Sequence, residues 1–296
     1  MEKTILILEG AYQGDDSLLK KMTDAMPGYK FEGYGSKGEV INAIENRFYA
    51  LVILGAEHLD IALRIYELNP LTKLIIVFED ALLFRIELTA IVAKTNVLDF
   101  IDQQYQNHKT VDLLKRIITR YYIKISSDIS STNTILLQKY SEAKNEIDGN
   151  KKGILFERFI SLLFGFLGYR EITRRIVDSS RNEVDLSIRN EIEDSFLNKF
   201  GKYILLECKN IPNYKVSKND FIVFNNKLEN SNGLSELGII ATTGGFAKAT
   251  YKEAMRESGT NGKILFLSNV EFLMLIQSDN KLGEFKKIID EQMKSN

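Results

Sequence analysis

The residues of this sequence that are best suited to chemistry lie at the end of one short apolar segment, residues 203–210 (YILLECKN). The segment is rich in strand-forming residues and ends in Glu207, Cys208 and Lys209. Because side chains alternate along a strand, Glu207 and Lys209 share one face, about 7 Å apart along the chain. A carboxylate beside a lysine can hold a divalent cation and steer or deprotonate a water molecule. The alternative is a structural salt bridge at a strand end, which is the commoner reason for such a pair.

A second acidic segment lies upstream, in residues 182–188 (NEVDLSI), whose polar and apolar residues alternate as in a strand. An antiparallel hairpin through the polar residues 189–202 places Asp185 beside Glu207. Two neighbouring carboxylates repel each other unless a cation lies between them. Mg²⁺ is commonly held by one or two carboxylates together with water and phosphate oxygens. The pair therefore predicts a Mg²⁺ site.

A third carboxylate, Glu157, lies in an apolar segment, residues 153–169. The segment is typical of a core helix that ends at Gly168. A carboxylate rarely lies in such a helix unless it is paired or binds a metal. Glu157 is accordingly either a further site residue or the partner of a lysine or arginine on an adjacent element.

Together, Glu157, Asp185, Glu207 and Lys209 resemble the PD-(D/E)xK nuclease superfamily, which has the restriction-endonuclease-like α/β fold. The Gly-x-x-x-Glu helix, the NEVDL strand and the LLECK strand stand in the order of that family. Residues 238–246 (GIIATTGGF), followed by residues 247–258, resemble the strand, glycine turn and helix of Mrr-type restriction enzymes. The resemblance covers about residues 150–270, and its one departure is that no proline precedes the first aspartate.

The resemblance implies a metal-dependent endonuclease that hydrolyses phosphodiester bonds in DNA with Mg²⁺, or alternatively Mn²⁺, in restriction or antiphage defence. Asp185, Glu207 and the backbone carbonyl of Cys208 are expected to bind the metal. Glu157 is expected to support a second ion or to orient a metal-bound water, and Lys209 to polarise the attacking water. Cutting both strands with one site per chain requires two protomers, so we expect a homodimer. The alternative is a module of the same fold that binds nucleic acid without cleaving it.

A basic stripe follows the glycine turn at residues 244–245. Lys248, Lys252 and Arg256 are spaced at i, i+4 and i+8, so they share one face of the predicted helix. DNA phosphates could contact the amino-terminal end of this helix and then the stripe. An ordinary solvated helix face is the commoner explanation of such a pattern.

The first half of the chain predicts an α/β domain with a parallel sheet covered on both faces, because continuous apolar strands alternate with helices. The strands are expected at residues 4–8, 29–34, 50–54, 73–78 and 97–101, and the helices at residues 15–26, 39–46, 59–68, 82–94 and 111–122.

This order resembles the receiver domain of response regulators, which has the flavodoxin-like fold. The phosphoacceptor aspartate of that family is replaced by Gly55, and Asp102 follows the fifth strand where a lysine is expected. The resemblance therefore implies a pseudo-receiver that dimerises or regulates through a protein partner or a small-molecule effector. An alternative is a Rossmann-like sensor that binds a cyclic oligonucleotide at residues 9–16 and 55–58 and activates the nuclease.

We thus expect a pseudo-receiver domain in residues 1–125, a connecting helix and linker in residues 126–150, and the nuclease domain in residues 151–296. The formal net charge of −1 predicts no general positive field, so DNA contacts must come from a local patch. The single cysteine excludes an internal disulfide. No apolar run approaches the ~18 residues of a membrane span, and no signal peptide is recognisable, so we expect a soluble cytoplasmic protein.

Overall fold

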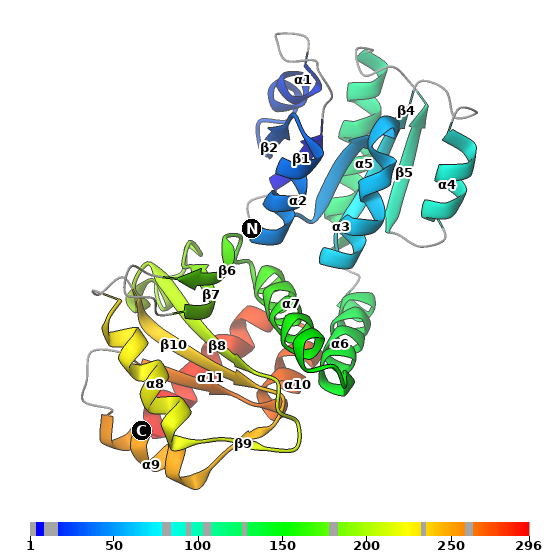
Figure 1. Cartoon of the computed structure of the whole chain (residues 1–296). Coiled ribbons are helices and arrows are strands. Elements are labelled where there is room, and N and C mark those ends of the chain that lie inside the picture. Colours follow the sequence, from blue (N-terminus) through cyan, green and yellow to red (C-terminus); the bar gives the residue numbers. More distant parts are fainter. Residues whose placement is uncertain are drawn as a thin grey trace. The chain divides into compact units, whose positions relative to one another are not determined.

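The computed structural model describes residues 4–8, 17–78, 84–92, 96–102, 108–125, 129–177, 183–231, 235–257 and 263–295. The chain divides into two compact units, residues 1–132 and 133–296 (Figure 1). Among the described residues, no helix combines the length and the apolar character needed to cross a membrane.

The first unit contains a five-stranded sheet of order β2-β1-β3-β4-β5, in which every neighbouring pair is parallel. This order is compatible with a flavodoxin-like domain. All residues of β1 and β3 are buried, as expected for parallel strands that are covered on both faces. The strands are β1 (Thr4–Leu8), β2 (Lys30–Tyr34), β3 (Leu51–Gly55), β4 (Lys73–Phe78) and β5 (Val97–Asp102).

Helices cover both faces of this sheet (Figure 1). On one face Leu6 belongs to a buried apolar cluster with Val40 and Ile65, and on the other Ile7 belongs to a cluster with Leu114. The alternation along β1 therefore supplies two separate cores. The helices are α1 (Leu18–Ala25), α2 (Lys37–Asn46), the 3₁₀ helix η1 (Ala56–Ile61), α3 (Ala62–Leu68), α4 (Arg85–Val92) and α5 (His108–Ile125).

One of the two segments predicted as an alternative cyclic-oligonucleotide site, residues 9–16 and 55–58, is not among the described residues. Residues 9–16, which include the predicted helix start at Asp15 or Asp16, lie outside the described residues. The helix α1 is capped by Ser17, whose hydroxyl accepts a hydrogen bond from the N–H of Lys20 at 3.2 Å. The second predicted loop, residues 55–58, is the start of η1, and Gly55 ends β3.

The second unit contains a mixed five-stranded sheet of order β12-β10-β8-β7-β6. Strands β12, β10 and β8 are parallel, whereas β8, β7 and β6 are antiparallel. A separate short parallel pair joins β9 to β11. The strands are β6 (Ile172–Val177), β7 (Glu183–Arg189), β8 (Tyr203–Lys209), β9 (Lys215–Val216), β10 (Ser235–Thr242), β11 (Gly245–Phe246) and β12 (Lys263–Leu267).

Helices lie on both sides of this sheet, with α8 and α9 on one side and α10 and α11 on the other (Figure 1). Leu205 of β8 packs against a cluster that contains Phe221 of α8 and Ala254 of α9. On the other side, the rings of Phe159 in α7 and Phe272 in α10 lie 5.5 Å apart. The helices are α6 (Ile129–Asn145), α7 (Gly149–Leu167), the 3₁₀ helix η3 (Leu197–Phe200), α8 (Lys218–Glu229), α9 (Lys248–Glu257), α10 (Asn269–Gln277) and α11 (Lys281–Ser295).

The junctions before α7 differ from the sequence prediction. The connecting helix and linker were expected in residues 126–150, but α6 ends at Asn145 and α7 begins at Gly149. Asp148 instead begins α7, because its carboxylate accepts hydrogen bonds from the N–H groups of Asn150 and Lys151. The expected end of α7 is confirmed, since Gly168 adopts φ 111°, a conformation that glycine tolerates best.

The helix expected between the halves, α6, is packed into the second unit from residue 133 onward. Leu136 and Tyr140 are buried, and the Tyr140 ring lies 5.0 Å from Phe159 and 5.6 Å from Phe272. Strand β6 was not predicted from the sequence. It forms the edge of the sheet and pairs only with β7 among the described strands.

Candidate functional site

The antiparallel ladder between β7 and β8 ends at the predicted site. Its last paired residues are Leu186 and Leu206, so the predicted hairpin is confirmed. In the same register the next two residues are Asp185 and Glu207. Beyond this point the Oδ2 atom of Asp185 accepts a hydrogen bond from the backbone N–H of Cys208 at 2.7 Å. A carboxylate thus takes the place of a backbone acceptor and fixes Asp185 beside the end of β8.

Glu207 is held by two lysines. The Nζ atom of Lys209 lies 2.9 Å from Oε1, and the Nζ atom of Lys227 lies 2.9 Å from Oε2. The Glu207 side chain is only 12% exposed, so these charges pair in a partly dehydrated environment. Removing one member of such a pair leaves an uncompensated charge, which is costly. Lys227 comes from α8, which covers the face of the sheet on which Glu207 and Lys209 lie.

Lys209 lies between Glu207 and the first turn of α8. Its Nζ atom is 3.9 Å from the Oδ1 atom of Asp220. Burial lowers the pKa of Lys209, but the hydrogen bond to Glu207 and the charges of Glu207 and Asp220 raise it by more, so this pKa lies above the ordinary lysine value. Lys209 is therefore suited to act as a charged donor rather than as a general base.

The environment of Asp185 disfavours its charge. Burial raises the pKa of Asp185, the hydrogen bond from Cys208 lowers it, and the charge of Glu207 raises it further; the net pKa lies above the ordinary aspartate value. A buried carboxylate whose charge is opposed by a neighbouring carboxylate is what a bound cation would stabilise. Asp185 and Glu207 are therefore the described residues best placed to share a metal ion.

Glu157 comes from a different element. It is buried in α7, a helix that packs against β6, β7 and β8. Burial raises the pKa of the Cys208 thiol well above its ordinary value, and the charges of Asp185 and Glu157 raise it further. The charge of Glu157 therefore reaches the end of β8, and the Cys208 thiol is poorly suited to nucleophilic attack.

Among the described residues, no three His, Cys, Asp or Glu side chains are grouped so that they could hold a metal ion. The structure brings Asp185, Glu207 and Lys209 together, and it does not add Glu157 to a three-carboxylate cluster. The arrangement brings two carboxylates and two ammonium groups together at the carboxyl-terminal end of β8. This set can bind a cation that keeps several water ligands, and it can place positive charge near an anionic substrate.

The end of β8 is fixed by the turn after β10. The hydroxyl of Thr242 and the N–H of Thr243 both donate to the carbonyl of Lys209, at 2.9 and 3.3 Å. A side chain at Gly244 would collide with the backbone carbonyls of Ile211 and Tyr214. The glycine turn that the sequence singled out therefore has a packing reason, because it lets the two loops approach closely.

The basic stripe lies on α9. Lys248, Lys252 and Arg256 are all exposed, and Arg256 pairs with Glu253 at 3.2 Å. The helix follows β10, whose last residue Thr242 lies in register with Lys209. α9 therefore begins at the same end of the strands as the site. The described geometry allows a phosphate contact by the stripe, and it is equally typical of a solvated helix face.

Comparison with known proteins adds no assignment, because no protein-family model matches the chain and no curated protein matches it significantly. The resemblance to the PD-(D/E)xK nucleases therefore remains a prediction from the residue pattern.

Two contacts of the candidate site were missed from the sequence. Neither the pairing of Lys227 with Glu207 nor the approach of Asp220 to Lys209 was predicted. A helix that follows the site strand could have suggested both residues. Asp220 and Lys227 are two helical turns apart, about 10 Å along α8. This distance is long enough for one to reach Lys209 and the other Glu207 on β8.

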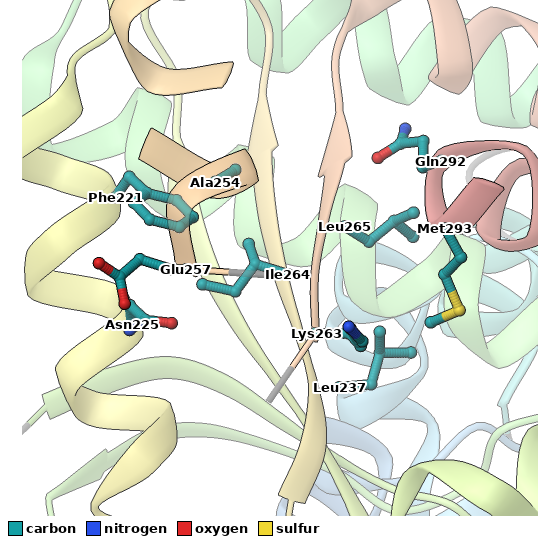
Figure 2. Close-up of a pocket in the computed structure, with 10 residues that line it drawn as sticks. All are labelled: Phe221, Asn225, Leu237, Ala254, Glu257, Lys263, Ile264, Leu265, Gln292 and Met293. Carbon is teal, nitrogen blue, oxygen red and sulfur yellow. The ribbon is translucent and has the colours of Figure 1, made fainter. Parts of the chain in front are cut away.

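A cavity of about 180 Å³ lies elsewhere in the second unit, between α8, α9, α11 and the strands β10 and β12 (Figure 2). Its wall includes Leu237 and Lys263, near the amino-terminal ends of these strands. Lys209 and Thr242 lie at the opposite, carboxyl-terminal ends of β8 and β10. The Gln292 amide beside the cavity already bonds the backbone of residue 266, at 2.9 and 2.8 Å. None of the predicted site residues lines this cavity.

Proposed function

We propose that the second unit is a divalent-metal-dependent nuclease of the PD-(D/E)xK type that hydrolyses phosphodiester bonds in DNA. The observation that supports this most is the meeting of Asp185, Glu207 and Lys209 where β7 and β8 separate. These three residues, which the sequence pattern indicated for their chemistry, come from two strands and are adjacent in the structure. A purely structural salt bridge would need no second carboxylate held against it.

The donor set is suited to Mg²⁺. Mg²⁺ is usually bound by one or two carboxylates and keeps water ligands, and Asp185 and Glu207 supply two. The raised pKa of Asp185, caused by burial and by the charge of Glu207, supports a cation between them. The carbonyl of Cys208 is a further proposed ligand. When bound, such an ion polarises the phosphate and makes a coordinated water more acidic.

The proposed roles follow from the surroundings of each side chain. Asp185 is fixed by the Cys208 N–H and presents its other oxygen for the ion. Lys209 remains protonated, so it donates to the attacking water or to the phosphate as negative charge develops. Glu157, whose charge acts on Cys208, would orient the site or support a second ion. Lys248 and the rest of the basic stripe would contact DNA phosphates.

The first unit is proposed to be a receiver-like domain that dimerises or regulates the nuclease, within a system for restriction or antiphage defence. Its parallel sheet of order 2-1-3-4-5 supports this. Gly55 ends the third strand, so the position of the phosphoacceptor carries no carboxylate. Sedimentation of the chain with and without acetyl phosphate tests the proposal. A homodimer that does not respond to acetyl phosphate is the expected result.

The nuclease proposal is tested with supercoiled plasmid DNA, incubated with the protein in Mg²⁺ or Mn²⁺ and, as a control, in EDTA. We expect nicked and linear products in the metal-containing reactions and none in EDTA or with Asp185→Asn. An RNA of the same sequence tests the choice of DNA. DNA that is bound but never cut in either metal would favour the non-cleaving module.

A further inference from the structure

Lys227 and Lys209 both bind Glu207, but they differ in what else they contact. Lys209 has a second carboxylate nearby, Asp220 at 3.9 Å. For Lys227, Glu207 is the one carboxylate within salt-bridge distance in the described part of the chain. If Glu207 turned toward a metal ion, Lys209 would keep a partner and Lys227 would lose its own.

Burial makes that loss expensive. The side chain of Lys227 is 16% exposed, compared with 31% for Lys209. A dehydrated ammonium group without an anionic partner is strongly unfavourable. The charge of Lys227 also acts on Asp185, the other proposed ligand. Lys227 therefore competes with a cation for both carboxylates.

A phosphate group would remove this conflict. It offers the anionic partner that Lys227 lacks once Glu207 binds metal, and it brings the negative charge that a divalent ion favours. A metal ion alone would take Glu207 from Lys227 and leave that lysine without an anionic partner. A metal ion bound together with a phosphate would give both Glu207 and Lys227 a partner of opposite charge. The cost of opening the Lys227–Glu207 pair is then met only when substrate is present.

We propose that Lys227 is a positioning residue that couples metal binding to DNA binding at this site. In the DNA-free protein it holds Oε2 of Glu207 and weakens metal binding. In the DNA complex it turns to the scissile phosphate and releases Glu207 to the metal. The inference rests on the proposed nuclease function. It adds an order of assembly, in which the metal ion binds tightly only when DNA is bound.

The first test measures Mn²⁺ affinity by calorimetry without DNA. We expect Lys227→Met to bind Mn²⁺ about tenfold more tightly than the wild type, equivalent to about 1.4 kcal/mol. Lys227→Arg keeps the charge and should resemble the wild type. Lys218→Met is the matched control, because Lys218 lies on the same helix but pairs with Glu253 at 2.9 Å. Circular dichroism checks that each variant is folded.

The second test uses the reciprocity of coupled binding, in which DNA and metal change each other's affinity by the same factor. The affinity for a labelled duplex with phosphorothioate linkages, which resist hydrolysis, is measured by fluorescence anisotropy with and without Mn²⁺. We expect Mn²⁺ to tighten DNA binding by a larger factor in the wild type than in Lys227→Met. Lys218→Met should retain the wild-type factor.

The outcomes separate the two proposals. If the wild type binds Mn²⁺, Asp185→Asn does not, and Lys227→Met equals the wild type in both tests, the coupling role of Lys227 is wrong and the nuclease proposal stands. If neither the wild type nor Lys227→Met binds Mn²⁺ with or without DNA, both proposals are overturned.

Discussion

Asp185 and Glu207 lie opposite each other, one position beyond Leu186 and Leu206, the last paired residues of the β7–β8 ladder. The two carboxylates therefore extend from neighbouring strands at the same level. The hydrogen bond from Cys208 to Asp185 keeps them there although the ladder has ended. This relationship gives the site its like-charge repulsion, and the repulsion is the physical basis for the first prediction.

The substitution Asp185→Asn should remove metal binding and cleavage while preserving the fold. The asparagine carbonyl can still accept the Cys208 N–H, and the loss of a charge beside Glu207 relieves repulsion. We expect the melting temperature of the metal-free variant to equal or exceed that of the wild type. Addition of Mg²⁺ should raise the melting temperature of the wild type only, because a ligand stabilises the state that binds it. Thermal melts with and without Mg²⁺ measure both effects.

The matched control is Asp194→Asn. Asp194 pairs with Lys286 at 2.7 Å, away from the site, and its carboxylate also accepts the N–H groups of Phe196 and Leu197. This variant should lose some stability and keep the Mg²⁺ response. An equal loss of the response in both variants would show that the Asp185 effect is not local.

Replacement of Lys209 by methionine should abolish cleavage without preventing metal binding. Lys209 contributes charge rather than a metal ligand, and removal of one preorganised donor to a developing charge typically lowers kcat about 10²–10³-fold. Single-turnover plasmid cleavage gives the rate, and Mn²⁺ calorimetry gives the affinity. Cleavage at the wild-type rate by this variant would contradict the proposed role of Lys209.

The sequence predicted those parts of the site that depend on local periodicity. Glu207 and Lys209 lie two residues apart on one strand, so alternation alone places them on one face. Asp185 was predicted beside Glu207 because an antiparallel hairpin connects their strands. The parallel sheet of the first unit was predicted in the same way, from apolar strands that alternate with helices.

Contacts that depend on the rotation of a packed helix could not be predicted in this way. Lys227 reaches Glu207 because Phe221 and Phe224 of α8 face the sheet, and the sequence alone does not fix which neighbouring polar residues then point at β8. The position of Glu157 has the same origin. Its helix was predicted, but the distance of its carboxylate from β8 depends on how α7 packs.

Asn210 shows how a residue just beyond the site supports it. The buried Nδ2 group donates to the carbonyls of Ala143 and Lys152 at 2.7 Å each, and Oδ1 accepts from the hydroxyl of Thr243 at 2.8 Å. Asn210→Ala would leave these buried groups without partners, so we expect a loss of about 1–3 kcal/mol in unfolding free energy. Urea denaturation measures the loss. A change below about 0.5 kcal/mol, typical of surface substitutions, would show that water replaces these bonds.

The capping box of α8 makes the helix that carries Lys227 sensitive to acid. The hydroxyl of Ser217 accepts the N–H of Asp220 at 3.2 Å, and the Asp220 carboxylate accepts from the N–H and hydroxyl of Ser217 at 2.9 and 2.7 Å. Burial raises the pKa of Asp220, but the Ser217 bonds and the charge of Lys209 lower it by more, to below the ordinary value of 3.8. The stability that Asp220 contributes is therefore present above pH 3.8 and is lost as the pH falls through its lowered pKa.

Two variants of this capping box test the acid sensitivity. Ser217→Ala should cost about 1 kcal/mol at pH 7, as expected for the loss of an N-cap. Asp220→Asn should be less stable than the wild type at neutral pH, and the difference should shrink as the pH falls below the ordinary value of 3.8, because the wild-type carboxylate is then protonated. Urea denaturation at neutral and acid pH measures both variants. A difference for Asp220→Asn that stays constant into acid would mean that the carboxylate charge contributes nothing, and that only the shape of the side chain caps α8.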